Sequence, residues 1–136
     1  AKQLITLKNL FSQTLTIETE IYILHKLAEL DDIEYIKDRA EDLLINRSKY
    51  LNFELEKYIG DILSDYLEPD EFISYCNTIF EEEHTVGLLY SMVRVYDELG
   101  QRDLALPIIN EWLTLYPANA NLNQLYEYMI QINSLQ

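Results

Sequence analysis

The sequence predicts a single all-α domain of about eight helices, on three observations. Apolar residues recur every three to four positions along almost all of the 136 residues, which is the period of an amphipathic helix. Only 3 Gly and 3 Pro are present, too few for the many turns of an all-β fold. The hydrophobic fraction of 49% supports a packed core and argues against disorder, and a chain of this length fits one domain, 1–136.

Eight apolar stripes define the expected helices in chain order. Their first members are Leu4, Ile17, Ile33, Leu51, Phe72, Leu89, Ala105 and Leu122. Consecutive helices pair into three hairpins near 17–48, 53–83 and 86–117. Helices over 2–13 and 119–133 are expected to cap the two apolar ends of the stack.

Polar residues and Pro mark the breaks between these helices. Thr16 is an N-cap candidate for the helix that starts at Ile17. The pair Asp31 and Asp32 separates the second and third helices. Pro69 stands in a first helical turn followed by acids, where both are favoured. Either Asn119 or Asn121 is expected to cap the last helix.

Residues 86–117 are organised more clearly than the rest of the chain. Gly100 suits the left-handed turn that ends a helix, and the small Ala105 lets the next helix approach closely. Pro117 stops that second helix, because proline cannot continue one. With Tyr96 as the large residue of the first helix, this spacing resembles the tetratricopeptide repeat, a unit of about 34 residues.

The resemblance implies antiparallel helical hairpins stacked as a short right-handed superhelix. Shifting the sequence by 69 or 33 residues aligns the earlier hairpins with 86–117, although with Asp31 and Leu67 at the position of Gly100. Phe72 stands where the repeat has a small residue, as does Val93. Larger residues at these positions predict a degenerate superhelix, and a generic antiparallel helical array is the alternative.

Members of this family bind an extended peptide or a helix in a concave groove, lined by the first helix of each hairpin. Most of the corresponding positions in this chain are acidic, so the resemblance implies an acidic groove with a few basic interruptions. The expected lining residues are Glu18, Ile21, His25, Glu29, Glu54, Lys57, Asp61, Asp65, Tyr90, Arg94, Asp97 and Glu98. The simpler interpretation of each acid is a solvated helix-surface residue, paired at i,i+4 as in Lys57–Asp61.

The net charge of −14 bounds the class of partner. Residues 16–83 hold 19 of the 24 acidic residues and only six of the ten Lys and Arg. Such a surface repels nucleic acid and anionic lipid, and it attracts a basic peptide or protein face. There is no apolar run long enough for a membrane span and no secretory signal, and the single Cys76 forms no internal disulfide. We therefore expect a cytoplasmic protein.

The titratable residues do not form a recognisable catalytic or metal-binding pattern. His25 and His84 are isolated, and the consecutive residues 81–84 (EEEH) would fan out around a helix axis. Cys76 lies within an apolar stripe and is expected to be a buried small hydrophobe. The sequence therefore predicts no enzyme activity, no metal and no cofactor.

The expected function is a protein–protein or peptide-binding scaffold that holds a partner segment in the acidic groove. One alternative is a structural or assembly module of a larger multidomain or membrane-associated protein, and another is a small acidic secretion-type chaperone. A peptide-sensing regulator and a homodimer through the terminal helices are also open. The stripe of Tyr116, Tyr126, Tyr128 and Met129 is either a second docking face or, more simply, part of the core.

Overall fold

The computed structural model describes residues 16–30 and 32–134, which form seven α-helices. A π-helical turn, Asp42–Asn46, and a short 3-10 turn, Ser48–Tyr50, follow the second of them. The helices are α2 (Ile17–Glu29), α3 (Ile33–Glu41), α4 (Phe53–Tyr66), α5 (Pro69–Phe80), α6 (Val86–Glu98), α7 (Arg102–Leu115) and α8 (Ala120–Ser134).

The all-α prediction is confirmed for this part of the chain, but the helix count is lower than predicted. The sequence predicts about eight helices, whereas seven lie in the described residues. The expected capping helix over 2–13 lies outside the described residues. The other expected capping helix corresponds to α8.

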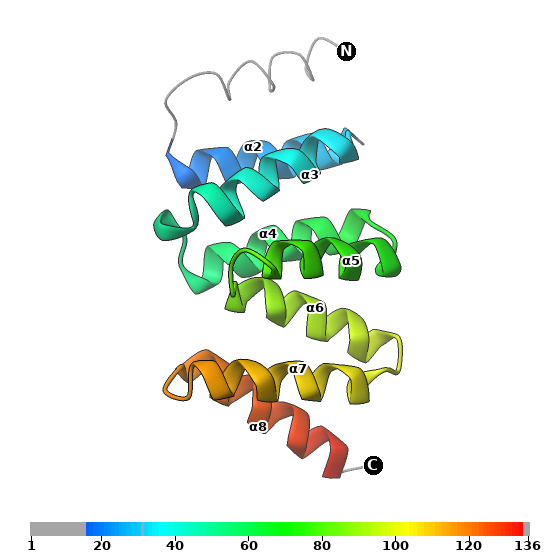
Figure 1. The fold of residues 1–136 in the computed structure, drawn as a ribbon. Helices are drawn as coiled ribbons and strands as arrows, with labels where there is room; N and C mark the ends of the chain where they lie inside the picture. Colours follow the sequence, from blue (N-terminus) through cyan, green and yellow to red (C-terminus); the bar gives the residue numbers. More distant parts are fainter. Residues whose placement is uncertain (1–15, 31, 135–136) are drawn as a thin grey trace.

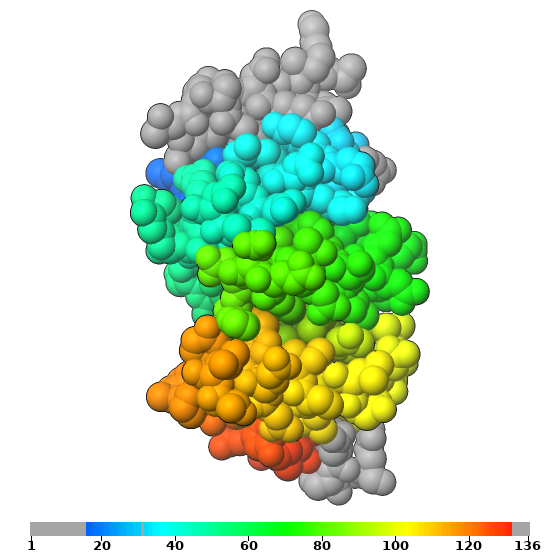
Figure 2. Space-filling view, viewed as in Figure 1, coloured from blue at the N-terminus to red at the C-terminus, as the bar shows by residue number. Residues whose placement is uncertain are grey.

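The helices lie in two rows that follow the order of the chain (Figure 1). One row contains α2, α4, α6 and α8, and each of these helices contacts the next member of the row. The other row contains α3, α5 and α7, which also contact the helices before and after them in the chain. Continuous segments therefore form successive bands of the surface from α3 to α8 (Figure 2).

Local capping explains most of the helix boundaries. The Thr16 hydroxyl accepts a hydrogen bond from the Thr19 N–H at 3.2 Å, as the sequence predicts. Asn119 caps α8 by accepting from the Leu122 N–H at 3.0 Å. Gly100 has φ of 71°, and the Gln101 N–H reaches back to the Tyr96 carbonyl at 2.8 Å, which closes the end of α6. The predicted cap at Thr16, the left-handed turn at Gly100 and the first-turn position of Pro69 are all confirmed.

The predicted stripe over Ile33–Leu44 is one continuous helix only as far as Glu41. The π turn then keeps Leu43 and Leu44 fully buried while it redirects the chain. This change places Arg47 against Glu20 of α2, where Arg39 also reaches Glu20 at 3.4 Å. Glu20 is only 3% exposed, so two guanidinium groups compensate a buried carboxylate that the sequence pattern did not reveal.

Helices α4 and α6 approach each other closely at two glycines. A Cβ added at Gly60 would lie 2.5 Å from Ser91 Oγ and 2.8 Å from Ser91 Cβ. A Cβ added at Gly87 would lie 2.6 Å from both the Lys57 backbone nitrogen and the Phe53 carbonyl oxygen. These glycines permit backbone contact between two helices of the same row, which larger residues would prevent.

We expect Gly87→Ala to lower the free energy of unfolding by about 1–3 kcal/mol, the usual cost of overpacking, despite the better helix propensity of alanine. Gly60→Ala should be less damaging, because its clash is with the side chain of Ser91 rather than with backbone atoms of α4. Urea denaturation checks both values. The exposed Asn77→Ala on α5 serves as a control with no expected effect. Unchanged stability of Gly87→Ala would show that α4 and α6 can separate freely.

Candidate binding groove

A pocket of about 410 Å³ lies on the face formed by α4, α6 and α8. Five of the residues expected to line the groove also line this pocket. They are Lys57, Asp61, Tyr90, Arg94 and Asp97. The remaining lining residues were not predicted as groove residues, and they are Ser91, Val93, Gln124, Leu125, Tyr128 and Met129.

The floor of the pocket is apolar. Val93, Leu125 and Met129 line it and are at most 5% exposed. Met129 therefore belongs to the core, as the simpler interpretation of the terminal stripe predicts. Tyr128 is different, because it lines the pocket and is 55% exposed. The floor thus offers a preformed apolar surface with an accessible aromatic ring at its side.

Tyr90 forms a second aromatic wall whose orientation is held by neighbours. Its hydroxyl donates to the Asn121 carbonyl at 2.7 Å, and its ring packs edge-on against Phe53 with centroids 4.8 Å apart. Burial raises the pKa of the Tyr90 hydroxyl above its ordinary value. The side chain is therefore a neutral, fixed wall that joins α4, α6 and the start of α8.

Asp61 is the centre of the charged groups at the pocket. It accepts from the Ser91 hydroxyl at 3.0 Å, and it pairs with Lys57 at 3.7 Å and with Arg94 at 3.4 Å. Arg94 also donates to the Ser64 hydroxyl. Asp97 is paired with Arg102 at the start of α7.

These pairs change the expectation of an acidic groove. Lys57 and Arg94 balance Asp61 and Asp97 in the lining, so the pocket itself carries no excess of acid. The acidic excess lies outside it, because Glu18, Glu54, Asp65 and Glu98 are exposed and make no ion pair with a described residue. None of these four lines the pocket.

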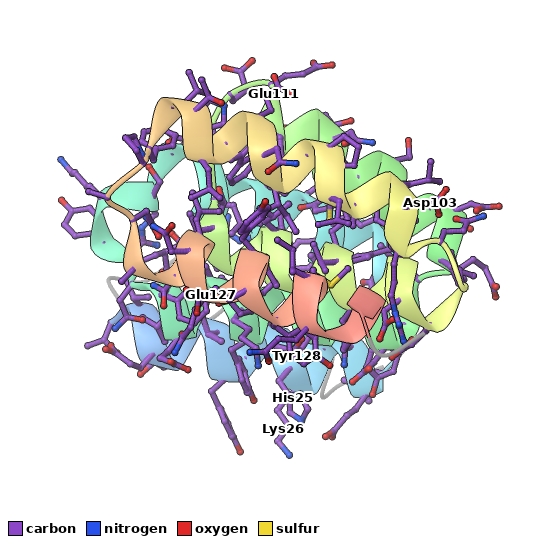
Figure 3. The ribbon with its side chains drawn as sticks, turned by 90° about the horizontal axis from the view of Figure 1, so that it is seen from below. His25, Lys26, Asp103, Glu111, Glu127 and Tyr128 are labelled. Carbon is purple, nitrogen blue, oxygen red and sulfur yellow. The ribbon has the colours of Figure 1, made fainter. Side chains whose placement is uncertain are left out.

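His25 and Glu29, which are expected groove residues of the first hairpin, lie outside the pocket. His25 pairs with Glu29 at 3.2 Å, and its ring lies 6.2 Å from that of Tyr58. Viewed along the stack, His25 and Tyr128 lie on one side, whereas Glu111 lies on the other with α7 (Figure 3). Ile21 is only 3% exposed and packs in the core, so its assignment to the groove is wrong.

The α4–α6 junction beside the pocket contains a half-buried carboxyl group, that of Glu56. Glu56 Oε1 accepts from the Gly87 N–H at 3.0 Å, at the first turn of α6. Burial raises the pKa of Glu56, and the nearby charge of Glu83 also raises it, while the hydrogen bond from Gly87 opposes both effects. This contact fixes the start of α6 against α4, and with it the register of the pocket walls.

Other reactive groups have structural surroundings. Cys76 is fully buried, and burial raises the pKa of its thiol. His84 lies edge-on to Trp112 with centroids 4.9 Å apart, and its Nδ1 lies 3.0 Å from the Tyr116 hydroxyl. Among residues 16–30 and 32–134, no three His, Cys, Asp or Glu side chains are grouped so that they could hold a metal ion.

Comparisons with protein-family models, curated proteins and solved structures each returned no match. The tetratricopeptide resemblance therefore depends on the residues of this chain alone. In the described part of the chain, no helix is both long enough and apolar enough to cross a membrane.

Glu56→Gln is expected to change how stability depends on pH. A raised pKa in the folded state means that stability present at low pH is lost as the pH rises through that pKa. Glutamine keeps the acceptor for Gly87 but does not ionise. The variant should therefore match the wild type below pH 4.5, the ordinary pKa of the group, and become the more stable protein as the pH rises above it.

Urea denaturation between pH 4 and 8 measures this difference. Glu56→Ala, which lacks the acceptor, should be less stable than Glu56→Gln at every pH. A difference between wild type and Glu56→Gln that does not vary with pH would contradict the assignment.

Proposed function

We propose that this chain is a protein- or peptide-binding scaffold, which holds a partner segment along the face of α2, α4, α6 and α8. The observation that carries the proposal is the pocket, with its buried apolar floor, two tyrosine walls and paired charges at its rim. Its volume of about 410 Å³ is within the range of sites that take a small ligand or a few side chains.

The two rows of helices support a tetratricopeptide-like solenoid as the class of scaffold. In such a stack the first helix of each hairpin lines one continuous face, and α2, α4, α6 and α8 contact one another in that order. We propose that these helices form the inner side of a short right-handed superhelix. The expected cytoplasmic location belongs to this proposal too.

A preorganised pocket favours binding for an energetic reason. Tyr90 is held by Asn121 and Phe53, and Asp61 by Ser91, Lys57 and Arg94. These side chains lose little conformational freedom when a partner arrives, so more of the interaction energy remains as affinity. An aromatic or large aliphatic side chain of the partner is the expected anchor, since it would bury against Val93, Leu125 and Met129.

A second candidate function is a structural or assembly module. Large apolar side chains are exposed on α7 and α8, with Leu104 at 49%, Leu115 at 54% and Ile130 at 42%. Such residues favour contact with a further protein element at this end of the stack. This contact would use a different surface from the pocket, so the two functions can be distinguished by variants.

The test of the scaffold proposal is selection from a displayed library of random 12-residue peptides. Selected peptides should bind Tyr128→Ala at least about tenfold more weakly than the wild type, because a hot-spot aromatic contributes about 2 kcal/mol. Tyr50→Ala is the matched control, since Tyr50 is 60% exposed and does not line the pocket.

Isothermal titration of the synthesised peptides measures the change, and thermal unfolding verifies that both variants fold. Peptides that bind Tyr128→Ala and the wild type equally would remove the pocket from the binding site. Peptides sensitive instead to Leu104→Ser or Leu115→Ser would favour the assembly function.

A further inference from the structure

We infer that the partner segment places an apolar side chain in the pocket and a basic side chain at the edge of the face where α4 and α6 end. This inference rests on the proposed binding function and specifies the chemistry of the partner. It follows from the register of α4 and α6, from the positions of two exposed acids and from the direction of the helix dipoles.

Side-chain contacts show that α4 and α6 run parallel with a register offset of about 30 residues. Glu56 bonds to Gly87, Asp61 to Ser91, and Ser64 to Arg94. The C-terminal ends of α4 and α6 therefore lie beside each other, just beyond Arg94. Asp61 and Arg94, which form an ion pair at the pocket, lie about one helical turn before these ends.

Two acids without an ion-pair partner among the described residues stand at this end. Asp65 follows Asp61 by four residues on α4, so it is one turn beyond the lining on that helix. Glu98 follows Arg94 by four residues on α6 and comes directly after Asp97, a lining residue that is already paired with Arg102. Asp65 and Glu98 are both exposed, and neither α4 nor α6 has a basic residue in its last turn. Arg94 lies nearer the pocket, where Asp61 and Ser64 hold it.

The helix dipoles distinguish this end of the face from the opposite one. Glu18 and Glu54 stand in the first turns of α2 and α4, where the partial positive charge of the helix N-terminus offsets their own charge. Asp65 and Glu98 stand near helix C-termini, where the partial negative charge of the carbonyl groups adds to theirs. Asp65 and Glu98 should therefore attract a cation more strongly than Glu18 and Glu54 do.

The geometry gives the spacing of the two recognition elements in the partner. Five helical residues separate Val93 of the pocket floor from Glu98, which corresponds to a rise of about 7.5 Å along α6. An extended segment covers about 7 Å in two residues, and a helical segment covers about 6 Å in four. The partner is thus a segment with an Arg or Lys two residues from a large apolar residue if extended, or four residues away if helical.

The test uses the peptides selected from the random 12-residue library on the wild-type protein, with Asp65→Asn/Glu98→Gln as the variant. We expect the selected peptides to share an apolar and a basic residue at this spacing. Their affinity for the double variant should fall about three- to tenfold at low salt, as for two exposed ion pairs, and the loss should shrink at raised salt.

Asp103→Asn/Glu111→Gln is the matched control. It removes the same charge from the α7 side, opposite Tyr128 (Figure 3), and should leave affinity within twofold. The denaturation midpoint of Asp65→Asn/Glu98→Gln should not fall, because it removes negative charge from helix C-termini.

Three results would overturn the inference. They are selected peptides without basic residues, equal losses in the variant and its control, or a loss seen with Glu18→Gln/Glu54→Gln and not with Asp65→Asn/Glu98→Gln. In each case continued sensitivity to Tyr128→Ala would show that the pocket still binds, so failure of this inference is distinct from failure of the proposed function.

Discussion

The close approach of α4 to α6 is the constraint on which the rest of the structure depends. Because Gly60 and Gly87 lack side chains, Ser91 can lie directly against α4 and the Gly87 N–H can reach Glu56. The two helices are thereby held parallel and in one register. That register brings Asp61, Ser91 and Arg94 together, and it sets the width of the pocket that α8 completes. The packing of α4 on α6 and the geometry of the pocket therefore have the same origin.

The distribution of charge separates acids that are paired between helices from acids that are exposed to solvent. Glu20 is buried between Arg39 and Arg47, and Asp61 and Asp97 are paired at the pocket. These acids stabilise contacts between helices. The net charge of −14 consequently acts on the surroundings through exposed acids such as Asp65 and Glu98. A count of acidic residues in the sequence does not make this distinction, because pairing depends on which helices meet.

Several site residues were predictable from the sequence, and the others were not, for identifiable reasons. Lys57, Tyr90 and Arg94 occupy positions that the repeat resemblance assigns to a binding face, and they line the pocket. Gln124 was missed, and Tyr128 was named only as part of a possible second docking face, because the groove was assigned to the first helices of the three hairpins and not to α8. Glycines within helical stripes were an available signal for the α4–α6 contact, since Gly60 and Gly87 are unfavourable for a helix unless close packing requires them.

The sequence by itself determined the helices and most of their ends. The signals that define them are the apolar period, the caps at Thr16 and Asn119, Pro69 and Gly100. Each signal acts on residues close by in the chain, so its effect can be predicted from the sequence. Only the tertiary structure decided that Ile21 is core, that Glu20 is compensated by Arg39 and Arg47, and that the pocket is balanced in charge. The pairs of Glu20 with Arg39 and Arg47, for example, join residues 19 and 27 positions apart, and they follow from helix packing rather than from any local pattern.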